Sequence, residues 1–358
     1  MTFLPNTRSS PAFYPMQFNV RSRAVRWIGL TEARYKTSSF LDERLLQGAP
    51  LPPWEPWATA QLAAHGVEKT CNFIFHIGHV GSTLLSRLLD EHPASMALRE
   101  PPVLRTLAQS YFTLSAREDM QERTALNHQI DVFGRIFSRT WRHDQTAVIK
   151  ATSFVSGMAA YLLHHMPSTR AIFLTVTPMA YLRGILGGAA RAEIPLMAPS
   201  RIERLNRRLG VTWTLEGMSE GESIAMSWLC EIIALHDASR VRRQDVLWFD
   251  FDQVLEAPQT ALGAAFTHFG WAADRKLIAD ITNGPILTQY SKASEHAYDA
   301  EARRAVLLQA DYEHGAEVRK GMDWLSDRSR AFPAVMEALI ATSKISCRST
   351  LVNSAAST

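Results

Sequence analysis

Short apolar segments alternate with longer segments of helical periodicity from residue 71 onward. The apolar segments are FIFHI (73–77), SMALRE (95–100), TAVIK (146–150), AIFLTV (171–176) and DVLWFDF (245–251). Four leucines, at 84, 85, 88 and 89, follow the first segment and fall on one face of a helix. Short apolar strands separated by helices favour a mostly parallel sheet that is covered on both faces. The pattern therefore predicts an α/β fold with a parallel β-sheet of about five strands flanked by helices.

The distribution of proline and of small polar residues divides the chain into three parts. Residues 1–67 are rich in proline and aromatic residues and read as an irregular N-terminal leader, which we expect to pack on the main domain. Residues 68–345 form the predicted α/β domain. Residues 346–358 are rich in Ser, Thr and Ala, and we expect a flexible tail there.

Composition excludes several classes of protein. Hydrophobic residues make up 46% of the 358 positions and charged residues 20%, which is typical of a globular chain. A net charge of only +3 argues against nucleic acid as a partner held by bulk charge. No run approaches the roughly 20 apolar residues of a membrane span, and the first residues do not form a signal peptide. Three widely spaced cysteines fit a reducing compartment, so we expect a cytoplasmic location.

The segment that follows the first predicted strand has the features of an anion site. It reads GHVGST and leads directly into the leucine-rich helix. Unpaired N–H groups and the dipole of a helix N-terminus favour an anion, and Gly78 and Gly81 let the backbone approach it. A Walker A loop would have lysine where this chain has Ser82, which argues against tight binding of ATP phosphates. The alternative is a turn and helix cap without a ligand.

Several segments together resemble the sulfotransferase family, its bacterial and tyrosylprotein branches more than its cytosolic aryl branch. FIFHIGHVGSTLLSRLLDEHP followed by LREP resembles the family's 5′-phosphosulfate loop, helix and second strand. The similarity continues, in the family's order, through VIKATSF (148–154), MPSTRAIFLTVTP (166–178), VLWFDFDQVLEAP (246–258) and GPILTQYSKASEHAY (284–298). It implies a fold like that of P-loop kinases. It also implies sulfuryl transfer from 3′-phosphoadenosine-5′-phosphosulfate (PAPS), without a metal, to a hydroxyl or amine of a small-molecule or peptide acceptor.

The resemblance assigns roles to individual residues. Glu100 matches a carboxylate that serves as the base, and Lys150 matches a lysine directed at the reacting group. His79 stands where the family has a permanently charged lysine or arginine, whereas an imidazole is only partly charged near pH 7. The cradle for the phosphosulfate would consist of Gly78, His79, Val80, Gly81, Ser82, Thr83 and Leu84. In the alternative reading, Glu100 pairs with Arg99 or Arg105, and Lys150 faces solvent.

The chain departs from the family at the site for the cofactor's 3′-phosphate. The family's Arg and Ser are replaced here by Val176 and Gly184, which offer no side-chain donor. Either another group holds the 3′-phosphate, for which Arg183 is the candidate with Arg191 nearby, or the ligand lacks a 3′-phosphate. The stretch 183–208 holds six Arg against two Glu, and it is alternatively a solvated helix face.

Two further hypotheses come from the end of the chain and from the fifth strand. Ser291 and Lys292 lie in a late loop that the family folds over the nucleotide, although a solvent-exposed loop is equally compatible with them. A kinase-like enzyme would use ATP and magnesium, with Asp250 or Asp252 on the metal, but we expect Asp252 to cap the next helix. A third possibility is an inactive protein that keeps the fold as a nucleotide-binding module.

Overall fold

A computed structural model describes residues 9–114, 119–288 and 300–355 of the chain, with side chains up to residue 345. Its centre is a five-stranded sheet in which every pairing is parallel. The strands are β4 (Asn72–His76), β5 (Ser95–Arg99), β6 (Thr146–Lys150), β7 (Ala171–Thr175) and β8 (Val246–Asp250). Each begins and ends within one residue of a predicted apolar segment. The predicted α/β class, with a parallel sheet of five strands, is confirmed.

The strand order β5-β6-β4-β7-β8 places the first strand of the domain at the centre. The chain leaves β4 to build one half of the sheet and then crosses β4 to build the other half. In such sheets, ligands bind outside the carboxyl ends of the strands, at the point where the chain changes direction. That point lies at the end of β4, where the glycine-containing loop begins.

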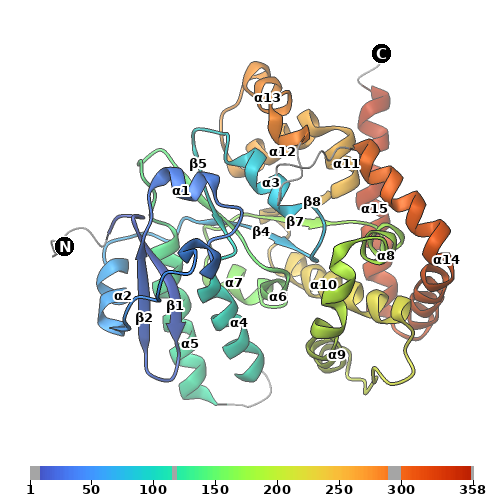
Figure 1. Ribbon diagram of the computed structural model, residues 1–358, viewed down its shortest axis with the longest axis horizontal. Helices are drawn as coiled ribbons and strands as arrows, with labels where there is room; N and C mark the ends of the chain where they lie inside the picture. The colour runs from blue at the N-terminus through green and yellow to red at the C-terminus, as the bar shows by residue number, and fades with distance from the viewer. Residues whose placement is uncertain (1–8, 115–118, 289–299, 356–358) are drawn as a thin grey trace.

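Helices cover both faces of the sheet, with α3 and α12 above it and α6, α7 and α10 below it in the view of Figure 1. The core is apolar, and Phe73 and Phe75 stack with a centroid distance of 4.9 Å. The helices of this domain are α3 (Ser82–Leu89), α4 (Pro102–Leu114), α5 (Met120–Phe137), α6 (Ser153–Ser156), α7 (Ala159–His165), α8 (Pro178–Leu186), η3 (Ala189–Glu193), α9 (Ile194–Leu209), α10 (Glu220–Val241), η4 (Arg243–Asp245), α11 (Phe251–Glu256), α12 (Pro258–Phe269), α13 (Arg275–Thr282), η5 (Pro285–Thr288), α14 (Ala300–Ala331) and α15 (Pro333–Ala355).

From residue 9 onward the N-terminal leader forms a small antiparallel sheet with helices, where the sequence predicts irregular structure. Its elements are β1 (Phe13–Asn19), β2 (Ala24–Gly29), α1 (Glu32–Thr37), η2 (Glu43–Leu46), β3 (Glu55–Pro56) and α2 (Trp57–Ala64). Pro15 interrupts the apolar pattern, but the strand accommodates it beside a bulge, where the register shifts between Pro15 and Gln17. Bulges are among the few strand positions that tolerate proline.

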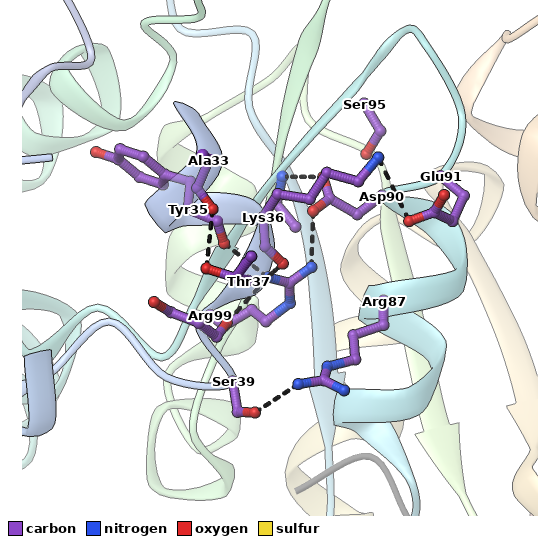
Figure 2. A network of polar contacts seen from close by, with 12 residues as sticks. Ala33, Tyr35, Lys36, Thr37, Ser39, Arg87, Asp90, Glu91, Ser95 and Arg99 are labelled. Atoms are coloured by element: carbon purple, nitrogen blue, oxygen red, sulfur yellow. Dashed lines mark hydrogen bonds and ion pairs between the residues drawn. The ribbon is translucent and has the colours of Figure 1, made fainter. Parts of the chain in front are cut away.

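The buried Arg99, at the end of β5, ties the leader to the sheet, as Figure 2 shows. Its Nη1 donates to the carbonyl oxygens of Tyr35 at 2.9 Å, Ser38 at 3.0 Å and Lys36 at 3.3 Å. Its Nη2 donates to Oδ2 of Asp90 at 2.7 Å. Carbonyl groups in the last turn of a helix lack partners within it, and Arg99 supplies one for the end of α1. This contact fixes the strand immediately before Glu100.

The C-terminal segment forms a long helix, α15, which continues to Ala355. Most of the predicted flexible tail, 346–358, is therefore helical. Across residues 9–114, 119–288 and 300–355, none of the helices combines the length and the hydropathy required to cross a bilayer.

Candidate functional site

A cleft of about 830 Å³ opens at the carboxyl ends of the central strands. Its floor is the loop 77–81 between β4 and α3, together with the first turn of α3. Its walls come from the leader, the ends of β5 and β6, helices α4, α6, α8 and α9, and the N-terminal part of α14. Elements from the whole length of the chain thus meet over the loop that the sequence identified as an anion site.

The loop has an unusual backbone that a neighbouring histidine stabilises. Gly78, His79 and Gly81 have φ values of +88°, +55° and +68°. The backbone N–H of Gly78 donates to Nδ1 of His76 at 3.0 Å, so the proton of this ring is assigned to Nε2, which lies 2.8 Å from the carbonyl oxygen of Ala151. His76 therefore connects the start of the loop to the chain that follows β6.

Packing against Phe251 and a positive φ both require glycine at position 81. A Cβ atom at this position would lie 1.9 to 2.4 Å from ring atoms of Phe251. The glycine accommodates the packing of this ring on the loop, and the approach of an anion to its backbone stays a prediction. A Cβ atom at Gly78 would instead lie 3.3 Å from Oγ of Ser153 and 3.7 Å from Nη2 of Arg201. Both of these residues line the cleft.

The N-terminus of α3 faces the cleft without a side-chain cap. Thr83 in its first turn is 2% exposed, and its Oγ1 has no hydrogen-bond partner among the described residues. Buried hydroxyl groups in proteins normally have partners, so the few exceptions call for an explanation. A ligand anion at the helix N-terminus would supply the missing acceptor.

Glu100 and Lys150 form an ion pair at the ends of the neighbouring strands β5 and β6. Nζ of Lys150 donates to Oε1 of Glu100, and the backbone N–H of Glu100 donates to the carbonyl oxygen of Lys150 at 2.7 Å. The lysine side chain is 1% exposed, whereas that of Glu100 is 19% exposed and faces the cleft. Lys150 does not face solvent, and Glu100 pairs with neither Arg99 nor Arg105.

The leader contributes a wall beside this ion pair. Phe40 lines the cleft, and Nζ of Lys150 lies 5.3 Å from the centre of its ring. The guanidinium of Arg44 stacks on the same ring at 3.5 Å. The leader therefore helps to hold the two charged residues in place.

The opposite wall contains a buried cluster of charge on α9 and α10. Both Arg201 and Arg204 pair with Glu231, whose side chain is fully buried. The guanidinium of Arg204 also lies 5.1 Å from the ring centre of Phe112 and 5.4 Å from that of Phe154. Nη1 and Nη2 of Arg201 have no hydrogen-bond partner within the described residues.

Most of the predicted site residues lie together in the cleft. Its lining includes the loop residues Gly78, His79, Val80, Gly81, Ser82, Thr83 and Leu84, as well as Glu100 and Lys150. Nε2 of His79 lies 3.5 Å from Oε2 of Glu193 on η3. Ser291 and Lys292 lie outside the described residues.

Arg183 and Arg191 are directed elsewhere. Nε of Arg183 donates to Oδ1 of Asp311 at 2.8 Å, and Arg191 forms a two-bond ion pair with Glu220 at 2.5 and 2.6 Å. Neither arginine is among the residues that line the cleft.

The cation that does lie near Gly184 is Arg303 on α14. Its Nη1 would be 3.7 Å from a Cβ atom at Gly184, and both residues line the cleft. Arg303 pairs with Asp252 and lies over the ring of Phe251.

Helix α11 is capped by Asp250, whose Oδ1 accepts from the backbone N–H of Asp252 at 2.9 Å. The expectation that Asp252 is the cap is therefore wrong.

The cleft carries a positive net charge. Six permanent cations line it, against three carboxylates at Glu100, Glu193 and Glu231. The cations are Arg44, Arg105, Lys150, Arg201, Arg204 and Arg303. Asp42 and Asp252 pair with Arg44 and Arg303 from outside the lining, which reduces the excess from three positive charges to one. Such a field favours an anionic ligand.

Sequence reasoning missed His76, Phe40, Arg201 and Arg303. His76 closes the predicted strand FIFHI, where it reads as part of the apolar segment. The other three lie in segments that no motif joins to the glycine loop. The single signal was the concentration of arginine in 183–208, which includes Arg201.

The chain is similar to solved sulfotransferase structures at low sequence identity. A sulfotransferase domain from the curacin biosynthetic pathway shares 12% identity over 72% of this chain and 97% of its own, with a TM-score of 0.39. A sulfotransferase domain of the Synechococcus PCC 7002 olefin synthase shares 14% identity over 70% of this chain and 96% of its own, with a TM-score of 0.40. Mouse SULT7A1, complexed with PAP, shares 8% identity over 77% of this chain and 91% of its own, with a TM-score of 0.40. No family profile matches the chain, and no curated protein does.

Proposed function

We propose that this protein is a sulfotransferase that transfers a sulfuryl group from PAPS to a hydroxyl or amine acceptor. The observation that carries the proposal is the concentration of unpartnered polar atoms in the cleft. Fifteen buried side-chain nitrogen and oxygen atoms of the described residues have no hydrogen-bond partner, and five of them belong to residues that line this cleft. All five are able to donate hydrogen bonds: Oγ1 of Thr83, Oγ1 of Thr152, Nη1 and Nη2 of Arg201, and Nε of Arg204. A polyanion would satisfy them.

The 5′-phosphosulfate would lie on the loop and on the first turn of α3. The backbone N–H groups there, with the hydroxyl groups of Ser82 and Thr83, would donate to its oxygens. Val176 is buried, and its side chain has no hydrogen-bond donor for a 3′-phosphate. Arg303, near Gly184, is the cation that would compensate for the missing Arg and Ser of the family.

Glu100 and Lys150 would serve the transfer step. The acceptor oxygen or nitrogen forms a bond to sulfur, and its proton passes to Glu100. The bond between sulfur and the bridging oxygen breaks, and its electron pair stays with the departing phosphate. Lys150 would stabilise the charge that develops on that oxygen, and His79 would assist it. Most of the catalysis then comes from positioning and electrostatic stabilisation in a preorganised site.

A panel of nucleotides tests the proposal. Thermal unfolding is measured with PAPS, adenosine 3′,5′-bisphosphate (PAP), AMP, and ATP with magnesium. A ligand at 100 times its dissociation constant stabilises the folded state by about 2.7 kcal/mol, which such a scan detects. We expect PAPS and PAP to raise the midpoint more than AMP does. Stabilisation by ATP with magnesium alone would favour the kinase hypothesis instead.

Binding without turnover would leave the third hypothesis, an inactive nucleotide-binding protein. Protein that binds PAPS is therefore mixed with panels of phenols, alcohols, amines and tyrosine-containing peptides, and PAP release is measured. We expect acceptor-dependent release of PAP. PAPS binding with no release above the acceptor-free rate across these panels would argue against the enzyme.

A further inference from the structure

The end of the Arg201 side chain is a buried cation whose hydrogen-bonding capacity is mostly unused. The side chain is 2% exposed, and its Nε donates to Oε1 of Glu231 at 3.2 Å. Nη1 and Nη2 have no partner among the described residues, although together they carry four N–H donors. Burying charged donors without partners is costly, so this arrangement suggests a ligand that completes it.

The unpartnered end of Arg201 lies beside the start of the glycine loop. Its Nη2 is 3.7 Å from the point that a Cβ atom of Gly78 would occupy, and Oγ of Ser153 is 3.3 Å from the same point. All three residues line the cleft. The guanidinium thus reaches from α9, across the cleft, to the loop that begins at the end of β4.

The charge around Arg201 is not neutralised by the protein. Glu231 is shared with Arg204, whose Nη2 donates to Oε1 at 2.6 Å and whose Nη1 donates to Oε2 at 3.3 Å. Two guanidinium groups and one carboxylate leave one positive charge in a buried place. Tyr181 is a neighbour: burial raises the pKa of its phenol, and the charge and polar contact of the Arg201 guanidinium lower it.

We propose that Arg201 and the start of the glycine loop form an oxyanion subsite that binds the terminal sulfuryl group of the donor. A guanidinium fork binds two oxygens of a sulfate or phosphate group at once and stays charged at every physiological pH. Arg201 would thereby supply, from α9, the permanent cation that His79 does not supply from the loop. The subsite follows from the geometry of Arg201, whereas its assignment to the donor rests on the proposed function.

Inorganic sulfate tests the subsite without any nucleotide. Calorimetric titrations with sodium sulfate, at constant ionic strength, compare the wild type with Arg201→Gln and with the control Arg208→Gln. Arg208 is on the same helix but pairs with Asp237 and does not line the cleft. A hydrogen bond to a charged group contributes about 1.5–3 kcal/mol, so we expect Arg201→Gln to weaken sulfate binding by about tenfold or more. The control should bind as the wild type does. Equal affinity in the wild type and Arg201→Gln would overturn the subsite.

The affinities for PAPS and PAP then show which group of the donor Arg201 contacts, because PAP has no sulfuryl group. We expect Arg201→Gln to weaken the binding of PAPS about tenfold more than that of PAP. An equal loss for both nucleotides would place Arg201 on a phosphate and overturn the assignment to the sulfuryl group. Unchanged PAPS binding with a raised KM for the acceptor would also overturn it, in favour of an anionic acceptor. Sulfate binding through Arg201 in a protein that binds neither nucleotide would refute the proposed function and leave the subsite standing.

A second variant distinguishes a loss of sulfate affinity from a loss of stability. Arg201→Lys keeps a cation next to Glu231 but removes the fork that grips two oxygens. Urea unfolding without ligand measures the stability of both variants. We expect Arg201→Lys to be more stable than Arg201→Gln, because it keeps a positive charge beside the buried Glu231, and still to lose sulfate affinity. Retention of full sulfate affinity by a folded Arg201→Lys protein would show that the fork has no role.

Discussion

Glu100 and Lys150 are neighbours because β5 and β6 pair in register and end at the same level, with Arg99 opposite Lys150 in the ladder. Glu100 follows the last residue of its strand and has a positive φ of 59°. This backbone conformation is uncommon for a residue other than glycine, and such residues cluster at functional sites. The carboxylate is thus held next to a buried ammonium group at the edge of the cleft.

Replacing Glu100 with glutamine should affect turnover far more than binding. Removing a positioned base costs on the order of 10²–10⁴ in rate, while the amide keeps the size of the side chain. We expect Glu100→Gln to bind PAP with nearly wild-type affinity and to lower kcat by that factor. Single-turnover transfer and PAP calorimetry measure the two quantities.

The same change also removes the carboxylate that pairs with the buried ammonium group of Lys150. Breaking one side of a buried ion pair is more destabilising than removing both partners. The double variant Glu100→Gln/Lys150→Met should therefore be more stable toward urea than Glu100→Gln alone, yet equally inactive. Normal turnover in folded Glu100→Gln would show that another group accepts the proton.

The two loop glycines should respond differently to substitution. Gly81→Ala places a Cβ atom against the ring of Phe251, so we expect it to lower the free energy of unfolding by more than the roughly 1–2 kcal/mol that a left-handed backbone costs an L-residue. Gly78→Ala carries the same backbone cost and places its Cβ atom 3.3 Å from Oγ of Ser153, a close contact that a small shift of this side chain relieves, so it should reduce sulfate and PAP affinity more than stability. Urea unfolding and calorimetry on both variants make the comparison.

A compensating change distinguishes packing from ligand approach at Gly81. If Phe251 is the obstacle, Gly81→Ala/Phe251→Leu should be more stable than Gly81→Ala. Loss of nucleotide binding by Gly81→Ala with unchanged stability would instead restore the first interpretation, in which the backbone at Gly81 touches the anion.

The sequence predicts the sheet well because β4, β5, β6 and β7 are almost wholly buried and read as continuous apolar runs, such as TAVIK, while the edge strand β8 is half-buried. The family resemblance gave Glu100 and Lys150 their roles one by one, and their ion pair follows from the parallel pairing of β5 and β6, which brings the ends of both strands to one edge. The strands of the leader were not predicted, because Pro15 interrupts the strand pattern and the bulge of β1 accommodates it. Arg201 could not be placed, because its contact with the loop depends on how α9 packs on α10, which no local spacing encodes.

The stability of the fold should decrease on acidification because of two histidines. Burial lowers the pKa of His268, whose Nε2 lies 3.1 Å from the carbonyl oxygen of Ala171, and burial likewise lowers the pKa of His236. Below the unfolded pKa of about 6.5, the unfolded chain then binds more protons than the folded one, so the free energy of unfolding decreases as the pH falls below that value. In His268→Gln, which keeps an N–H donor, the decrease between pH 7 and pH 5 should be smaller. An identical decrease in both proteins would exclude His268 as its source.

Cofactor affinity should depend on pH if His79 takes the place of a permanent loop cation. An ordinary imidazole titrates near pH 6.5 and is mostly neutral at pH 8, whereas a lysine stays charged across this range. We expect PAPS to bind more weakly as the pH rises from 6 to 9. His79→Lys should flatten this dependence and keep the affinity, and His79→Ala should lose both the dependence and part of the affinity. Calorimetry at several pH values measures all three proteins.

Two neighbours of His79 provide the controls for this prediction. Oε2 of Glu193 lies 3.5 Å from Nε2 of His79, so Glu193→Gln shows how much of the pH dependence its carboxylate contributes. Arg201 stays charged throughout and should set the affinity that remains at pH 9. We therefore expect PAPS affinity to depend more steeply on pH in Arg201→Gln, because more of the remaining attraction then comes from His79, which titrates. Equal affinities and slopes in wild type and His79→Ala would mean that the helix N-terminus and Arg201 hold the anion without His79.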